Sequence, residues 1–302
     1  MAKQDFGRIA IMLLAFVIYI IMLVFSQLSS SGISNGIFLQ TIGNVSEKYA
    51  TDVTPAKWAF SIWGVIFAWQ ILWFIYMFTG FCRRNVYNWM YSGPILSYGF
   101  YISWIINNLL LISWLFLWDR EQLIAALIFL CWITFTGYIV LFFSYRGVHA
   151  RIEELQAYHK SDLWLLRILV HNGVAAYITW TTIATLINFA VVLTYVGEVS
   201  RSTAATVCLS VLLIEVIAWF VVENFFLDKY VRYTLTIYPV VILALSGNIA
   251  KNFKPDSPGT NGIFYAVLLG IASTLFLLRI LLVLWKHLKP QPGVKSENTV
   301  NY

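Results

Sequence analysis

The stretch TPAKWAFSIWGVIFAWQILWFIY, residues 54–76, carries a single charged residue and four tryptophans, at positions 58, 63, 69 and 73. Pro55 suits the first turn of a helix, where its missing N–H has no partner to lose, and Thr54 is a candidate N-cap. About 20 apolar residues in a helix cross the hydrocarbon core of a bilayer. The stretch therefore predicts a transmembrane helix that begins near its proline.

The composition of the whole chain agrees with a membrane protein. Sixty per cent of the 302 residues are hydrophobic and 11 per cent are charged, whereas soluble domains average about 25 per cent charged. The net charge of +6 comes from basic residues in loops between apolar runs. We therefore interpret it as a topology signal rather than as a surface that binds nucleic acid.

Long apolar runs recur along the chain and predict about eight transmembrane helices. Backbone groups in lipid find no outside partner, so every spanning segment should be helical. The expected fold is an all-α polytopic membrane bundle. The first run, Ile9–Phe25, is longer than the 7–15 residues of a signal-peptide core, so we expect a retained helix. The expected spans are residues 9–26, 57–79, 95–117, 122–144, 168–195, 203–222, 231–250 and 263–285.

Basic residues are distributed unequally between the two sides of the membrane. The side that holds both termini carries 13 lysines and arginines in its loops and tails, and the other side carries six. The positive-inside rule therefore predicts cytoplasmic termini. Asn44 begins the sequon Asn-Val-Ser in the first non-cytoplasmic loop, where glycosylation is consistent with this topology. The compartment is left open.

Aromatic residues within residues 54–76 follow one face of the helix. Phe60, Trp63 and Phe67 stand at offsets of 0, 3 and 7, which a helix places on the same side. Interfacial belts explain tryptophans near the ends of a span, but they require no single-faced stripe. The stripe favours a surface that packs against other helices or against a ligand.

A second one-faced row lies in the fifth apolar run. Tyr177, Trp180 and Asn188 stand at offsets of 0, 3 and 11. An asparagine at membrane depth should face protein or a cavity. Asn108 and Trp114 in the third run add a polar and an aromatic side chain that either join helices or line the same site.

The segments TPAKWAFSIWGVIF, ISWLFLW and YITWTTIATLIN resemble the TspO/translocator protein superfamily, the tryptophan-rich sensory proteins. The resemblance covers residues 9–195. In the family's second helix, its proline, phenylalanine, tryptophan and aromatic positions correspond here to Pro55, Phe60, Trp63 and Phe67. In the family's third and fifth helices, the corresponding residues are Trp114, Trp180, Ala184 and Asn188.

The resemblance implies a five-helix core with an aromatic pocket that binds porphyrins, sterols or other apolar aromatic ligands. Leu111 replaces the family's usual third-helix asparagine, and Asn108 lies one turn earlier. The usual proline of the fifth helix is also missing. We expect the core over residues 1–196, three further helices over 197–288 and a flexible cytoplasmic tail over 289–302. A tetrapyrrole is a candidate ligand, membrane lipid surrounds the chain, and a homodimer is compatible with the sequence.

Two charged residues lie well inside predicted spans, away from their ends. Glu215 and Arg279 occupy the sixth and eighth runs, and a lone charge at the bilayer centre costs at least about 2.5–3.5 kcal/mol. We predict that the two form a structural ion pair, with a proton-coupled carrier as the alternative. His171 lies within two turns of Tyr177 and is a further candidate for the pocket.

No phosphate-binding loop, nucleophile elbow or metal-binding motif occurs in the sequence. We therefore expect neither catalytic nor metal-ligating residues, and favour a binding or transport protein over an enzyme. The alternative is a structural or regulatory membrane protein that acts through partner helices. The candidate ligand-binding residues are Phe60, Trp63, Phe67, Asn108, Trp114, His171, Tyr177, Trp180 and Asn188.

Overall fold

The computed structural model describes residues 6–31, 36–80, 83 and 95–289, and this part of the chain is folded into helices without any strand. Residues 290–302, which make up nearly all of the expected tail, lie outside it. The helices are α1 (Phe6–Ser30), α2 (Ile42–Lys48), η1 (Lys57–Ser61), α3 (Ile62–Thr79), α5 (Tyr98–Asp119), α6 (Leu123–Ala150), α7 (Ile152–Tyr158), α8 (Lys160–Leu165), η2 (Leu166–Asn172), α9 (Gly173–Tyr195), α10 (Arg201–Val221), η3 (Val222–Phe226), α11 (Asp228–Val231), α12 (Ile237–Asn252) and α13 (Thr260–Leu288).

Seven helical segments in the described residues are long and apolar enough to cross a membrane. This confirms the polytopic all-α bundle. Two of the segments contain a π-helical turn, η2 and η3, and the fifth is continuous over 36 residues from Lys160. The spans are Phe6–Ser30, Lys57–Thr79, Tyr98–Asp119, Leu123–Ala150, Lys160–Tyr195, Arg201–Phe226 and Thr260–Leu288.

The predicted span over residues 231–250 is shorter than expected. Its helix, α12, begins at Ile237 and has 16 residues, about 24 Å of helix against about 30 Å of hydrocarbon. Pro239 explains the start, because a proline is tolerated in a first turn but cannot bond to an earlier one. The preceding non-helical backbone bonds to Asn172, which accepts from Leu235 N at 2.8 Å and donates to Tyr233 O at 2.8 Å.

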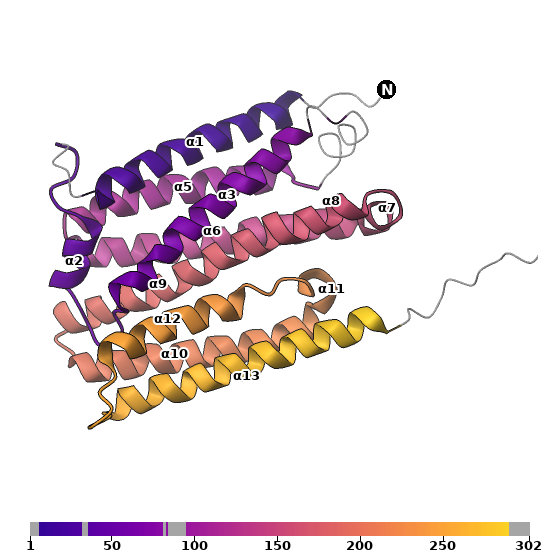
Figure 1. Cartoon of the computed structure of the whole chain (residues 1–302). Helices are drawn as coiled ribbons and strands as arrows, with labels where there is room; N and C mark the ends of the chain where they lie inside the picture. Colours follow the sequence, from indigo (N-terminus) through magenta and orange to yellow (C-terminus); the bar gives the residue numbers. More distant parts are fainter. Residues whose placement is uncertain (1–5, 32–35, 81–82, 84–94, 290–302) are drawn as a thin grey trace, which may run out of the picture.

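The long helices lie side by side and alternate in direction (Figure 1). With α12 as an eighth pass, α1 begins and α13 ends at the same end of the bundle, while α2 lies at the opposite end (Figure 1). We call these the terminal end and the α2 end. The side of the membrane that each end faces stays a prediction. The last three passes pack against α9 through α10 and α12.

One buried asparagine joins three of the first five spans. Asn107 is fully buried, and its amide donates to Ile133 O at 2.6 Å and to Thr136 Oγ1 at 2.9 Å. Its carbonyl accepts from Tyr177 OH at 2.6 Å. Gly137 permits this close approach of α6 and α9, because a Cβ there would stand 2.8 Å from Ile178 Cγ1.

The predicted pair between Glu215 and Arg279 is wrong. Arg279 is fully buried, and its ion-pair partners are Glu223 at 3.3 Å and Asp228 at 3.6 Å. It also donates to Asn224 Oδ1 at 2.7 Å. Glu215 instead lies on the exposed face of α10.

Depth along the helices explains the choice of partner. α10 and α13 start at the same end of the bundle (Figure 1). Arg279 is 19 residues from the start of α13, Glu223 is 22 residues from the start of α10, and Glu215 is only 14. Since each residue rises about 1.5 Å, Glu223 is closer to the level of Arg279.

We predict that Arg279→Met destabilises the fold, because it leaves the Glu223 and Asp228 carboxylates without their buried partner. Removing one member of a buried pair costs about 3–5 kcal/mol. Thermal unfolding of the purified chain in detergent measures the loss. Glu215→Gln is the matched control, and as an exposed substitution it should change stability by no more than about 0.5 kcal/mol. Equal melting temperatures for Arg279→Met and the parent would contradict the assignment.

Candidate functional site

A large open cavity occupies the half of the bundle near the α2 end. Its volume is about 1480 Å³, more than the roughly 300–1,000 Å³ of most small-molecule sites. α1, α3, α5 and α9 line its walls, and one residue of α6 also contributes. Lining residues such as Val24 and Gly64 are exposed, so the cavity opens beside α1 and α3 toward the surroundings.

Aromatic rings from η1, α3 and α9 meet on one wall of the cavity. Trp180 lies edge-on to Phe60 and Trp63, with ring centroids 6.0 and 6.4 Å apart. Trp63 and Phe67 lie 5.3 Å apart at a tilt of 30°. Trp114 faces the cavity from α5 and stacks on Trp118 at 5.8 Å. Faces and edges of this kind suit flat apolar ligands.

Three polar atoms on this lining have no hydrogen-bond partner among the described residues. They are the indole Nε1 atoms of Trp114 and Trp180 and the amide Oδ1 of Asn188. Asn188 uses only its amide nitrogen, which donates to Ala184 O at 3.2 Å. Buried polar groups are paired in most proteins, so two free donors and one free acceptor mark positions where a ligand can bond.

The floor of the cavity is a packed cluster between the cavity and the terminal end. Tyr19 OH donates to Phe67 O at 2.8 Å and fixes α1 against α3. Beyond this bond, Trp73 and Trp104 pack edge-on at 5.5 Å. Tyr177 packs on Trp104 at 5.9 Å. The cavity therefore ends near the middle of the bundle.

Six of the nine candidate ligand-binding residues line the cavity: Phe60, Trp63, Phe67, Trp114, Trp180 and Asn188. Two others lie in its floor. Tyr177 is turned toward Asn107, and Asn108 donates to Trp104 O of its own helix at 2.7 Å. Both stand about one turn beyond the last lining residues of their helices. Whether the six bind a ligand stays a prediction.

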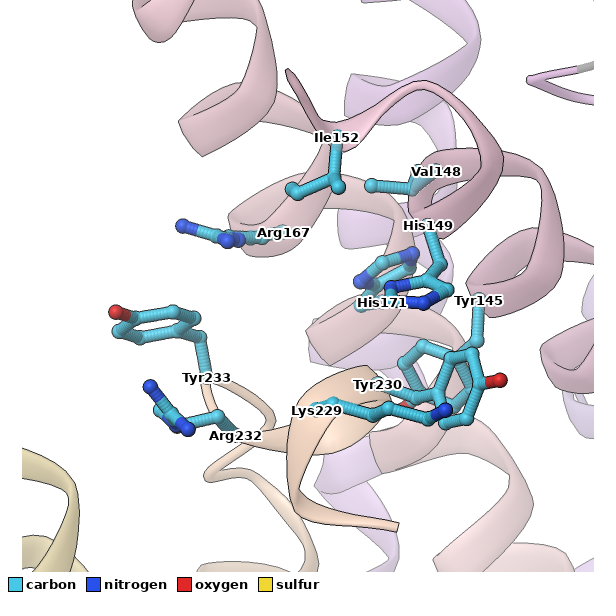
Figure 2. A pocket seen from close by; sticks show the side chains of 10 residues that line it. All are labelled: Tyr145, Val148, His149, Ile152, Arg167, His171, Lys229, Tyr230, Arg232 and Tyr233. Carbon is cyan, nitrogen blue, oxygen red and sulfur yellow. The ribbon is translucent and has the colours of Figure 1, made fainter. Parts of the chain in front are cut away.

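His171 lies away from this cavity. It is nine residues before Trp180, and nine residues at about 100° each make two and a half turns, which places the two side chains on opposite faces of the helix. His171 therefore faces α6, where its ring lies 4.5 Å from that of Tyr145. It lines a separate small pocket at the terminal end (Figure 2).

Sequence reasoning did not identify the charged residues that hold the cavity mouth. Asp119 ends α5 and accepts from the backbone N–H groups of Leu39 and Gln40, each at 2.9 Å. Glu121 accepts from Lys48 Nζ at 2.5 Å and from Tyr49 OH at 2.7 Å. The sequence signal was the charged run that follows the third apolar segment. These bonds hold α2 over the mouth, where Asn44, the predicted glycosylation site, is exposed.

The bonds to Glu121 also change its titration. Hydrogen bonds from Gln40, Lys48 and Tyr49 lower the pKa of Glu121 to about 2. Because the folded-state pKa lies below the ordinary value, the carboxylate stabilises the mouth at neutral pH. This contribution is lost as the pH falls from about 4.5 toward 2.

Comparison with known proteins places the chain in a family. A family model described as TSPO-like protein matches residues 11–283. The match extends past residue 195, where the sequence motifs end, and includes the last three helical passes. No curated protein and no solved structure matches the chain.

We predict that Glu121→Gln loosens α2 over the cavity mouth. Amide hydrogen exchange across residues 42–49 at neutral pH should rise several-fold, because the uncharged amide no longer holds Lys48. Below about pH 2 the variant and the parent should converge, since the carboxyl of the folded parent then carries a proton. Glu153→Gln, which removes an exposed carboxylate near the terminal end, is the control. Unchanged exchange in Glu121→Gln would show that other bonds hold α2.

Proposed function

The chain belongs to the TSPO-like protein family, and from this premise we propose that it binds a small apolar or aromatic ligand in the cavity between α1, α3, α5 and α9. A tetrapyrrole or a sterol-like molecule is the ligand class proposed. We propose binding, or transport that depends on binding, rather than catalysis.

The single observation that supports this proposal most directly is the convergence of six sequence-selected residues on one cavity. Their side chains come from three different membrane spans, so packing inside one helix does not explain the arrangement. An apolar wall with a few unpaired polar atoms is the usual composition of a small-molecule site. The free atoms on Trp114, Trp180 and Asn188 supply the polar part.

The distribution of polar and apolar residues on the lining favours an amphipathic ligand. The apolar residues Leu23 of α1 and Ile71 of α3 line the cavity on one side. Polar lining residues such as Gln27 and Thr41 lie near α2. An amphipathic ligand can therefore place its ring system against the tryptophans and its polar end at the mouth. Both tetrapyrroles with carboxylates and sterols with a hydroxyl have this form.

The carrier alternative loses its structural basis. It required Glu215 and Arg279 to act together, but Arg279 pairs with Glu223 and Asp228. Glu215 is not part of this group and is exposed on the outer face of α10. The alternative of a structural protein that acts through partner helices predicts no saturable ligand binding.

We predict that Trp63→Leu weakens binding of protoporphyrin IX by about tenfold to thirtyfold, because loss of a buried aromatic anchor costs about 1.4–2 kcal/mol. Saturable quenching of tryptophan fluorescence in the purified full-length protein measures the affinity. Trp132→Leu is the matched control, since Trp132 is 53 % exposed on α6 and lies outside the cavity. The affinity of Trp132→Leu for protoporphyrin IX should stay within about twofold of that of the parent.

A competition experiment separates the two ligand classes. If cholesterol displaces protoporphyrin IX from the parent and Trp63→Leu weakens the binding of both compounds, both occupy the cavity. Equal weakening by Trp63→Leu and Trp132→Leu, or no saturation with either compound, would contradict the proposal.

A further inference from the structure

A second, smaller pocket lies at the terminal end of the bundle and collects positive charge. Its volume is about 20 Å³, enough for one group the size of a water molecule. The end of α6, the π-turn η2 and the segment around α11 surround it (Figure 2). Its lining residues are Tyr145, Val148, His149, Ile152, Arg167, His171, Lys229, Tyr230, Arg232 and Tyr233.

Two of the cations around the pocket have no carboxylate partner in the described part of the chain. The Arg167 guanidinium lies over the Tyr233 ring at 4.1 Å, and Lys229 Nζ lies over the Tyr230 ring at 4.8 Å. Arg232, in contrast, is bound to Asp228 at 2.6 Å. The nearby acid is thus already engaged, and Arg167 and Lys229 leave an excess of positive charge at the pocket.

A buried nitrogen faces the same pocket without a partner. His171 is 4 % exposed, and its Nε2 makes no hydrogen bond to any described residue. The ring also bonds to the backbone of Ser144. A buried ring nitrogen left unpaired is costly. Because it lines a pocket with room for one small group, its missing partner is expected to come from a ligand.

We propose that this pocket receives one oxygen of a phosphomonoester, which lies beside His171, while the rest of the phosphate stays at the pocket's opening near Arg167 and Lys229. Arginine and lysine both donate to phosphate oxygens. The phosphomonoester has a second pKa near 6, so it offers either a P–OH group or a bare oxygen. His171 Nε2 matches both, since a neutral ring accepts from P–OH and a protonated ring donates to oxygen.

The position of the pocket favours a lipid as the source of the phosphate. Arg167 and His171 lie in the first third of the long helical segment that starts at Lys160, close to the end of the bundle. Basic pockets between transmembrane helices at that depth suit anionic headgroups. A soluble phosphate has the same chemistry, so the experiment must distinguish the two sources.

The test uses the purified full-length protein in detergent and dioctanoyl phosphatidic acid as the probe, with binding followed by native mass spectrometry. The double variant Arg167→Gln/Lys229→Gln should weaken binding at least tenfold. Arg146→Gln removes an exposed charge at the same end, outside the pocket, and should change binding by less than about twofold. Thermal unfolding verifies that each variant is folded, and Lys229→Gln alone changes only an exposed side chain.

His171→Phe tests the role of the buried nitrogen, because the ring still packs beside Tyr145 while Nε2 is lost. The substitution should weaken the binding of phosphatidic acid several-fold and leave the binding of phosphatidylglycerol, a phosphodiester, unchanged. Competition by millimolar inorganic phosphate, lost in the double variant, would support the phosphate site and identify a soluble source. Equal losses in the double variant and Arg146→Gln, or no preference over phosphatidylcholine, would overturn the proposal.

Discussion

The bilayer gives buried polar groups no outside partner, and this constraint determines how the bundle is joined. Asn107 connects α5, α6 and α9 through both ends of its amide. Asn172 satisfies the non-helical backbone that precedes α12. Arg279 holds α13 against η3 and α11. Each of these side chains links segments that are far apart in sequence, so the helices pack in one arrangement.

The same constraint distinguishes packing from binding. Most buried asparagines and arginines in the described residues meet a partner, whereas the polar atoms of Trp114, Trp180, Asn188 and His171 named above do not. These unpaired atoms all lie on the lining of a cavity. Polar groups that the chain satisfies itself build the bundle. Unpaired atoms also occur in the packed interior of the described residues, such as Nε1 of Trp73 and of Trp104, so it is the combination of an unpaired atom with a cavity lining that marks a position for another molecule.

The sequence predicted well what depends on local spacing. The stripe Phe60, Trp63 and Phe67 faces the cavity because helical periodicity fixes which side chains share a face. The family resemblance was confirmed, and the all-α membrane fold follows from apolar runs that few other structures can accommodate. Pro239 also carried the signal for a late start of α12, since it excludes earlier helical bonding, although hydropathy alone extended that span to residue 231.

Relations between helices were less predictable, because they depend on depth and rotation. Glu215 and Arg279 seemed complementary as isolated charges in apolar runs, but matching their distance from the α2 end selects Glu223 instead. Asn108 and Tyr177 have the right residue types for the cavity and miss it by about one turn. The spacing of residues along one helix does not predict where the cavity floor lies. The Tyr19–Phe67 bond that helps to form the floor joins residues 48 positions apart.

The helical segment from Lys160 to Tyr195 contributes lining residues to both the large cavity and the small pocket. Its first part carries Arg167 and His171, and its second part carries Trp180 and Asn188. The two and a half turns between His171 and Trp180 direct them to opposite faces of one continuous helix. The two pockets are therefore separated by helix backbone, open at different ends of the bundle and have different linings, one basic and one aromatic. A ligand that fits one lacks the complementary chemistry for the other, so the two sites can be tested independently.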